Sequence, residues 1–369
     1  LIVFMHQHMA TEDYPPIREL DHELPLLRDP AGGFNMRQEG GGFLSGVYEH
    51  EPEFVFKDGI PPEFGQELMT PNLDRSTDFL AAAMARIPAF GQVGIKTIYN
   101  GPTSRTPDHQ PMLGPVPGVP NHFIAAGYAA GIMQAGFTKY LAQWIAEGEP
   151  EEDMSELDVR RFGIHADRAF TFDVVHAGHT FSNAIPYPYG ERAAGRPART
   201  SALYDRLNAE GAVFGVRNGW EVANWFAGPD DDPAEPSSFR RPRWQAAVGR
   251  EVAVAAEASA LADFSYLSLF KISGPGAEGF LETLSAASLP APGRAAVAPF
   301  LTKTGRVATC LRIARTKDDE FLLIGPGEHE RRDHDWLWRQ LPADGPAGLE
   351  NVRLENESGR HGILLLTGP

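Results

Sequence analysis

The histidines near the start of the chain are the first residues whose type and spacing could do chemistry. His6 and His8 stand two positions apart in the segment LIVFMHQHMA. Side chains alternate along a β-strand, so both imidazoles would lie on one face if this segment is a strand. Such a pair could bind a metal ion, or one imidazole could transfer protons while the other packs. Because no acidic residue or third histidine completes a ligand set here, we predict no metal site.

Two other candidates are weaker. His176 and His179 are three positions apart in VVHAGHTF, a segment that we do not expect to be helical, so we expect no metal site there either. Cys310 is the single cysteine of the chain, which excludes an intrachain disulfide. It lies in an apolar stretch, where a cysteine is usually packed as a small hydrophobic side chain rather than used as a nucleophile.

The stretch FIAAGYAAGIMQAGF, residues 123–137, resembles a ligand-binding turn between a strand and a helix. Gly127 would let the chain leave the strand with an unusual φ, and Gly131 would let a planar ligand approach the backbone. The free N–H groups and the dipole of the following helix favour an anion or a carbonyl oxygen. The glycines do not have the G-x-G-x-x-G spacing, however. Tight packing of the strand against the helix explains them equally well.

The elements that must position these residues can be predicted for the first half of the chain. We expect a helix over 76–90, with Ser76 or Thr77 as its N-cap and Phe79, Leu80, Met84 and Ile87 on one face. A helix after the glycine turn should carry an apolar stripe that includes Ile132, Gly136, Tyr140, Leu141, Trp144 and Ile145. The remaining expected elements are a strand over 1–10, a hairpin loop over 29–35, a strand over 94–102 and an irregular Pro/Gly-rich loop over 106–121.

The second half begins with an acidic run over 147–158, which we interpret as a solvated linker. Further breaks are predicted at 186–199 and 228–243. Strand, turn and helix should follow over 264–286, then a strand pair over 305–316 and 319–326, a helix over 330–341 and a last strand over 362–369. The fold class predicted is mixed α and β, with antiparallel hairpins rather than strict βαβ alternation.

Length and charge exclude some functions. A chain of 369 residues has room for two or three domains. Its net charge of -16, from 33 basic and 49 acidic residues, argues against nucleic acid or acidic membranes as partners. No apolar run is long enough for a transmembrane helix, and no basic leader marks a targeting signal. We expect both ends to be cut from a longer chain, located in the cytoplasm of a bacterium or the mitochondrial matrix of a eukaryote.

The order of motifs resembles the dimethylglycine dehydrogenase and sarcosine dehydrogenase family of flavoproteins. The similar segments include 24–49, 100–150, 157–163, 200–226 and 264–284. The resemblance implies an α+β fold in three parts. These are the C-terminal half of a D-amino-acid-oxidase-like FAD-dependent oxidoreductase fold (1–151), a small middle domain (152–197) and the N-terminal part of a folate-binding domain similar to the glycine-cleavage T-protein, an aminomethyltransferase (198–369). The dinucleotide-binding half of the flavin domain is expected outside this chain.

The resemblance also implies roles for residues near a flavin. His6 matches a histidine that the family uses around the substrate amine. Asn35 stands where the family often has a tyrosine that contacts substrate. Arg37 could pair with a substrate carboxylate through its planar guanidinium, or equally form a surface ion pair. Positions that match the FAD-binding part of the family are Gly127, Tyr128, Gly131, Ile132, Met133, Gln134, Asp108 and Pro111.

In the T-protein-like part, Cys310 and Leu311 match a folate-binding position where an acidic residue commonly precedes the leucine. A thiol is a poor acceptor for a pterin N–H. The implied activity is FAD-dependent oxidative demethylation of dimethylglycine or a sarcosine-like amine. Electrons would pass to an electron-transfer flavoprotein or oxygen, and the one-carbon unit to tetrahydrofolate. The alternative is a folate-binding or aminomethyl-transfer module whose oxidoreductase half is not catalytic.

Overall fold

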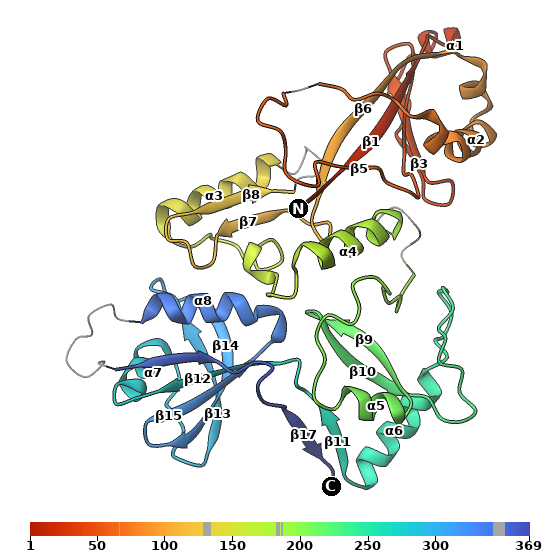
Figure 1. Ribbon diagram of the computed structural model, residues 1–369. Coiled ribbons are helices and arrows are strands. Elements are labelled where there is room, and N and C mark those ends of the chain that lie inside the picture. The colour runs from red at the N-terminus through yellow and green to blue at the C-terminus, as the bar shows by residue number, and fades with distance from the viewer. Residues whose placement is uncertain (66, 128–133, 182–184, 186, 342–350) are drawn as a thin grey trace. The chain divides into compact units, whose positions relative to one another are not determined.

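The computed structural model describes residues 1–65, 67–127, 134–181, 185, 187–341 and 351–369 (Figure 1). The chain forms two compact units. Unit 1 contains Leu1–Met112, Ala125–Lys139 and Asp167–Gly195, and unit 2 contains Leu113–Ile124, Tyr140–Ala166 and Arg196–Pro369. Each unit is therefore built from segments that are separate in the sequence, and the domain limits predicted at 151 and 197 stay a prediction.

Unit 1 is built on an antiparallel sheet in which β1 is the central strand. The strand order is β2-β3-β4-β1-β5, and β6 pairs with the other edge of β1. The strand predicted at the start of the chain and the hairpin loop over 29–35 are confirmed. The strands are β1 (Ile2–Thr11), β2 (Leu27–Asp29), β3 (Phe34–Glu39), β4 (Gly42–Val47), β5 (Phe54–Val55) and β6 (Ile95–Arg105).

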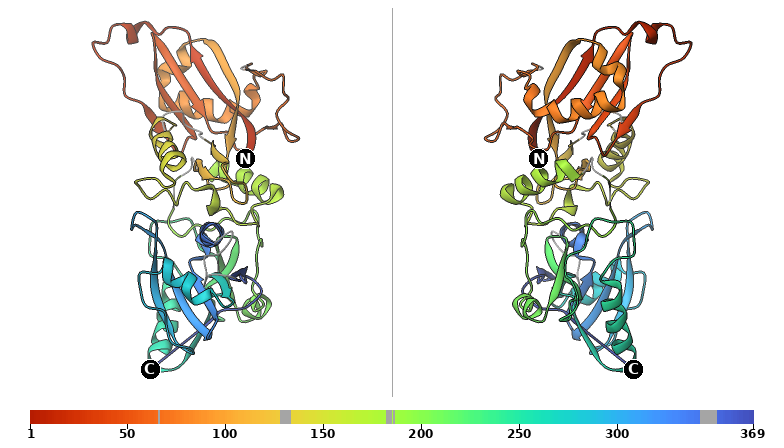
Figure 2. Two further views of the ribbon diagram at one scale, coloured as in Figure 1. Left: turned by 90° about the vertical axis from the view of Figure 1, so that its left-hand side faces the viewer. Right: turned by 90° about the vertical axis from the view of Figure 1, so that its right-hand side faces the viewer.

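One face of this sheet is covered by α2 (Thr77–Arg86), as both views in Figure 2 show. Phe79 and Ala83 are buried against the sheet, which confirms an amphipathic helix here. Met84, expected on the same face, is instead 43% exposed. Ser76 precedes the helix as predicted but makes no side-chain cap bond, because its hydroxyl accepts a hydrogen bond from Gln7 Nε2 at 3.3 Å.

The segment VVHAGHTF lies inside α4 (Arg168–Phe181), so the prediction that it is not helical was wrong. Val174 and Val175 are buried, and this burial outweighs the weak helix propensity of valine. Asp167 is an N-cap of this helix that we did not predict from the sequence. Its Oδ1 accepts a hydrogen bond of 2.8 Å from the N–H of Phe170, which is the N-cap pattern.

The loop over 106–121 was expected to be irregular, but part of it is a strand. β7 (Met112–Pro115) pairs with β8 (Phe123–Ala126), which precedes α3 (Gln134–Glu147). A Cβ at Gly114 would lie 2.9 Å from the Trp144 ring, so glycine admits the indole there. Ile145, expected in the apolar stripe of α3, is 58% exposed.

Unit 2 contains a five-stranded antiparallel sheet with the order β13-β14-β15-β12-β16. Helices α7 and α8 pack on it, and Phe280, Leu281 and Leu337 join the buried side chains of the sheet. The strand pair and the two helices predicted here are confirmed. The sheet and its helices are β12 (Ser268–Ser273), α7 (Ala277–Leu284), β13 (Ala295–Leu301), β14 (Val307–Lys317), β15 (Glu320–Gly325), α8 (Glu330–Gln340) and β16 (Arg353–Asn356).

The rest of unit 2 contains two further antiparallel strand pairs, β9 with β10 and β11 with β17. The last strand predicted from the sequence is β17, so that prediction is confirmed. These elements are α5 (Tyr204–Ala209), β9 (Ala212–Arg217), β10 (Trp220–Phe226), α6 (Gln245–Glu257), β11 (Ala260–Asp263) and β17 (Leu364–Thr367). The short helices of the described residues are α1 (Pro15–Arg18), η1 (Leu73–Ser76), η2 (Pro88–Gln92), η4 (Val159–Arg161) and η5 (Gly327–His329).

A buried ion network ties η4 to α8 within unit 2. Arg160 is 7% exposed, and its Nη2 lies 2.7 Å from Asp158 Oδ2. Its Nη1 donates at 2.8 Å to Asp335 Oδ2. Both carboxylates are buried as well, so each of the three charges depends on the others for compensation.

None of the helices in the described ranges has both the length and the hydropathy that a bilayer crossing requires.

Candidate active site

His6 lies at the centre of a polar cluster on one face of the unit 1 sheet. As strand alternation predicts, His6 and His8 share that face, with their ring centroids 4.8 Å apart. The Tyr48 ring stacks on His6 at a centroid distance of 5.9 Å. His6 Nδ1 lies 3.6 Å from Glu49 Oε2. An imidazole is thus held between an aromatic ring and a carboxylate.

Glu49 belongs to this cluster but was not predicted from the sequence as a site residue. Its side chain is 1% exposed, and Gln7 Nε2 donates a 3.3 Å hydrogen bond to Oε1. Burial by itself raises the pKa of Glu49, but the contacts with His6, its own backbone N–H and Gln7 outweigh burial and lower it. A carboxylate that stays ionised turns Nδ1 of His6 toward itself and leaves Nε2 for a reacting group.

Asn35 and Arg37 lie on the same strand, β3, but in different surroundings. Asn35 Nδ2 donates a 3.0 Å hydrogen bond to the Tyr48 hydroxyl, so Asn35 is joined to the ring that stacks on His6. The Arg37 side chain is 45% exposed, and its guanidinium contacts Glu39 Oε2 at 2.5 Å. Of the two interpretations left open for Arg37, the structure places it in the surface ion pair.

Helix α4 brings a third histidine to the cluster. The His179 ring lies 4.6 Å from the Phe4 ring and 6.4 Å from the His6 ring, and His179 is 1% exposed. Burial lowers the pKa of His179 and that of His8 to about 4. Both imidazoles are therefore neutral near pH 7, and Glu49 is the charged group that faces His6 directly.

We predict that acid destabilises the protein through these histidines. The pKa values of His8, His109 and His179 are lowered to about 4, mainly by burial, from 6.5 in the unfolded chain. Below pH 6.5 the unfolded chain therefore binds more protons, and stability is lost as the pH falls from 6.5 through 4. Each such shift is worth on the order of 3 kcal/mol by pH 4.

Chemical unfolding between pH 7 and pH 4 measures this effect. His8→Asn removes one of the titrating groups and should flatten the acid limb by on the order of 2–3 kcal/mol. The exposed His22 is the matched control, because His22→Asn should leave the slope unchanged. Equal slopes for the wild type and His8→Asn would show that His8 is not held neutral by the fold.

The loop before β7 is held together by Asp108, whose Oδ1 accepts hydrogen bonds from Thr106 Oγ1 at 3.0 Å and from the Gln110 N–H at 3.1 Å. Pro111 is buried in the same loop. Gly127 has φ +79, the unusual conformation that the sequence reading expected. A Cβ there would lie 3.0 Å from Thr106 Cγ2, so the glycine packs against this loop.

The other expected flavin contacts Tyr128, Gly131, Ile132 and Met133 lie outside the described residues, as does the side chain of Gln134. One polar side chain of the loop region nevertheless fits a polar ring edge. Both ring nitrogens of His109 are buried and have no hydrogen-bond partner among the described residues. Orphaned buried donors and acceptors are costly, and a bound group with complementary atoms would satisfy them. The residues present thus fit the ring end of FAD, whereas the segments that form unit 1 contain no G-x-G-x-x-G spacing for its phosphates, and the match at 274–279 lies in unit 2.

Helix α4 touches this loop at Gly178. A Cβ at Gly178 would overlap with His109 Nε2. We predict that Gly178→Ala pushes the imidazole aside, lowers the free energy of unfolding by about 1–3 kcal/mol and weakens flavin retention. Thermal unfolding and flavin content after gel filtration measure the two effects. Gly249→Ala in α6 is the control, because nothing lies within 4 Å of its Cβ position and alanine should stabilise that helix slightly. A Gly178→Ala protein as stable as wild type would contradict the overlap.

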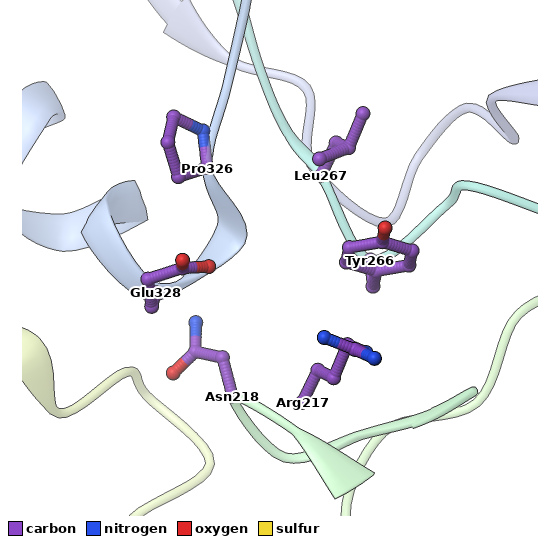
Figure 3. Close-up of a pocket in the computed structure, with 6 residues that line it drawn as sticks. All are labelled: Arg217, Asn218, Tyr266, Leu267, Pro326 and Glu328. Carbon is purple, nitrogen blue, oxygen red and sulfur yellow. The ribbon is translucent and has the colours of Figure 1, made fainter. Parts of the chain in front are cut away.

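Unit 2 has a separate open cavity of about 490 Å³ (Figure 3). Arg217 ends β9 and Asn218 follows it in the turn, and the Arg217 guanidinium lies 5.8 Å from the centroid of the Tyr266 ring. The cavity is lined by Arg217, Asn218, Tyr266, Leu267, Pro326 and Glu328. An aromatic ring beside a cation suits a flat, partly anionic ligand.

Cys310 and Leu311, the expected folate contacts, lie on opposite faces of β14 and do not line this cavity. Leu311 is fully buried in the core of unit 2. Cys310 is exposed, so the expectation that it packs as a small hydrophobic side chain was wrong. The residues around it on β14 alternate between a buried and an exposed face of the strand, and Cys310 lies on the exposed face. Within the described residues, no group of three or more His, Cys, Asp or Glu side chains is placed to hold a metal ion.

Family models match almost the whole chain in three consecutive parts. They are the FAD dependent oxidoreductase over residues 2–144, the FAD dependent oxidoreductase central domain over 147–201 and the GCVT N-terminal domain over 203–369. The fold and the site thus define a protein of the FAD-dependent oxidoreductase class joined to a glycine-cleavage T-protein domain.

Individual relatives show which family within this class the chain resembles. Mitochondrial dimethylglycine dehydrogenase of Homo sapiens is 36% identical over 100% of this chain and 43% of its own length. Mitochondrial sarcosine dehydrogenase of Mus musculus is 31% identical over 61% of this chain and 24% of its own length. The mitochondrial pyruvate dehydrogenase phosphatase regulatory subunit of Mus musculus is 31% identical over 95% of this chain and 40% of its own length.

The chain belongs to the dimethylglycine dehydrogenase and sarcosine dehydrogenase family, as its order of motifs predicted. It spans less than half the length of the curated relatives that it matches.

Proposed function

We propose that this protein oxidises the C–H bond beside the nitrogen of an N-methylated glycine-type amine. The observation that carries the proposal is the His6–Glu49 pair, at 3.6 Å, on the face of the sheet that also presents Tyr48. Bound FAD would supply the redox chemistry by accepting the hydride equivalent. The loop held by Asp108 and the backbone at Gly127 would contact its ring, together with Tyr128, Gly131, Ile132, Met133, Gln134 and Pro111.

In this proposal His6 Nε2 accepts the proton of the substrate ammonium group. Oxidation of the adjacent carbon needs a neutral amine, because the nitrogen lone pair stabilises the developing positive charge. The Glu49 carboxylate stabilises the imidazolium that forms and keeps the ring oriented. The stacked Tyr48 ring, held by Asn35, limits the tilt of the imidazole.

The complete flavin-loaded protein tests this function. Dimethylglycine or sarcosine added without oxygen should bleach the flavin absorbance, whereas glycine, which lacks an N-methyl group, should do so far more slowly. Reoxidation by oxygen or by an electron-transfer flavoprotein then identifies the acceptor. A protein that binds flavin but that no methylated amine reduces would refute the proposal. It would favour the alternative in which the oxidoreductase half is not catalytic.

We also propose that unit 2 binds tetrahydrofolate, which would take up the one-carbon unit. The cavity beside Tyr266 supports this step, because a pterin could stack on the phenol ring and a carboxylate could pair with Arg217. Folate titration monitored by tryptophan fluorescence tests it, with Arg217→Gln as the variant expected to bind more weakly and Cys310→Ser to probe the expected contact. Absence of saturable binding would remove the folate step and leave hydrolysis to formaldehyde.

A further inference from the structure

Arg105 ends β6 and is a cation that has no counter-ion among the described residues. It makes no hydrogen bond or ion pair with any residue in the described parts of the chain, and its Nε is buried. Burial lowers the pKa of Arg105, but a guanidinium remains charged at neutral pH. A partly buried cation without a carboxylate partner is costly, and an anionic ligand would offset that cost.

The register of the sheet places Arg105 on the same face as His6. Across β1 and β6, Ile2 pairs with Arg105 and His6 pairs with Gly101. Cross-strand partners in an antiparallel pair point to the same side, and residues two apart along a strand do so too. His6, Gly101 and Arg105 therefore share one face, which is the face that carries the polar cluster.

Gly101 leaves space beside His6 on this face. It has no side chain, and of the atoms in the described parts of the chain a Cβ built there would meet only Leu68 Cδ2, at 3.9 Å. Arg105 acts electrostatically on Tyr48 and His179, whose rings lie 5.9 Å and 6.4 Å from the His6 ring. The cation thus faces the same cluster as His6, and the open position at Gly101 is available to a ligand.

The charges on this face are complementary to those of a zwitterion. Glu49 is the negative charge next to His6, and Arg105 is the positive charge at the other end. His8, His109 and His179 have pKa values of about 4 and add no charge near pH 7. An amino acid has its ammonium and carboxylate groups at opposite ends, so it would match the two ends of this face.

We propose that Arg105 binds the carboxylate of the substrate and thereby restricts the His6 site to N-methylated amino acids. This inference rests on the proposed function for the identity of the substrate. It also assigns to Arg105 the pairing with a substrate carboxylate that the sequence left open for Arg37. The planar guanidinium can hold a carboxylate through two parallel hydrogen bonds, a geometry that a lysine ammonium does not reproduce.

The test compares three ligands in the complete flavin-loaded protein. Dimethylglycine carries the carboxylate, 2-(dimethylamino)ethanol replaces it with a hydroxyl group, and trimethylglycine keeps it on a quaternary nitrogen that has no lone pair to oxidise. Arg105→Gln should raise KM for dimethylglycine and Kd for trimethylglycine by about 10- to 100-fold, the value of a charge-assisted hydrogen bond. It should leave KM for the amino alcohol within about threefold of wild type, a difference below about 1 kcal/mol.

Arg105→Lys is the second variant, because it keeps the charge and guards against misfolding of Arg105→Gln. It should lose less affinity than Arg105→Gln and keep the flavin content of wild type. Arg18→Gln is the matched control, since Arg18 is an exposed arginine of the same unit paired with Asp13.

Each outcome separates the inference from the proposed function. If methylated amines fail to reduce the wild-type flavin but trimethylglycine binding still depends on Arg105, the function fails and the carboxylate site stands. Unchanged carboxylate affinity in both Arg105 variants would overturn the inference while leaving the function intact. An equal loss of affinity for all three ligands in Arg105→Gln would also overturn it. So would a loss of carboxylate affinity in Arg37→Gln but not in the Arg105 variants, or the absence of carboxylate binding by the wild type.

Discussion

Replacing His6 with asparagine should slow reduction of the bound flavin by dimethylglycine about 100- to 10,000-fold, the range that a general base typically contributes. Asparagine keeps a polar side chain of similar reach but cannot take the proton of the ammonium group at neutral pH. Binding of trimethylglycine, whose nitrogen has no proton to lose, should change much less. The rate of anaerobic flavin bleaching after rapid mixing measures the effect.

The pH profile separates a proton-transfer role from a structural one. If His6 transfers the proton, a pH-dependent limb of the wild-type rate should be absent in His6→Asn. Glu49→Gln should shift the limb and cause a smaller loss of rate, because the neutral amide no longer stabilises the imidazolium. His22→Asn, at an exposed position, is the control. A His6→Asn protein that bleaches within threefold of the wild-type rate would remove His6 from the mechanism.

Replacing Arg160 with methionine should destabilise unit 2 by about 3–5 kcal/mol, the largest effect on stability that we expect. The cost arises because Asp158 and Asp335 would remain buried as carboxylates without the guanidinium that both of them contact. Methionine has a similar length and would fill much of the space, so the loss reports the missing charge rather than a cavity. Equilibrium unfolding in urea measures it.

Two further variants identify the cause. Arg339 contacts Asp335 from a more exposed position, with a side chain that is 35% exposed, so Arg339→Gln should cost less than about 1 kcal/mol. The double variant Arg160→Met, Asp158→Leu should lose less than the sum of its single changes, because it removes the orphaned carboxylate together with its partner. Strict additivity would mean that the network stabilises only through packing.

Much of the fold follows from patterns that are local in the sequence. Strand alternation put His6 and His8 on one face, and turn residues marked the hairpin before Phe34. The wrong secondary-structure predictions at α4 and β7 share one cause. The helix at α4 depends on burying Val174 and Val175, and the strand β7 depends on pairing with β8, and a local pattern shows neither.

The sequence by itself determined the family, the order of the three parts and the presence of a histidine pair on the first strand, because these depend on local periodicity and on motif order. Only the tertiary structure decided which groups meet that pair. Glu49, His179 and Arg105 reach His6's face from the segment after β4, a distant helix and the far end of β6, and they do so through strand register and helix packing. The packing of unit 2 also decides that Cys310 is exposed. Contacts between residues far apart in the chain are fixed by the whole core, and no short pattern encodes them.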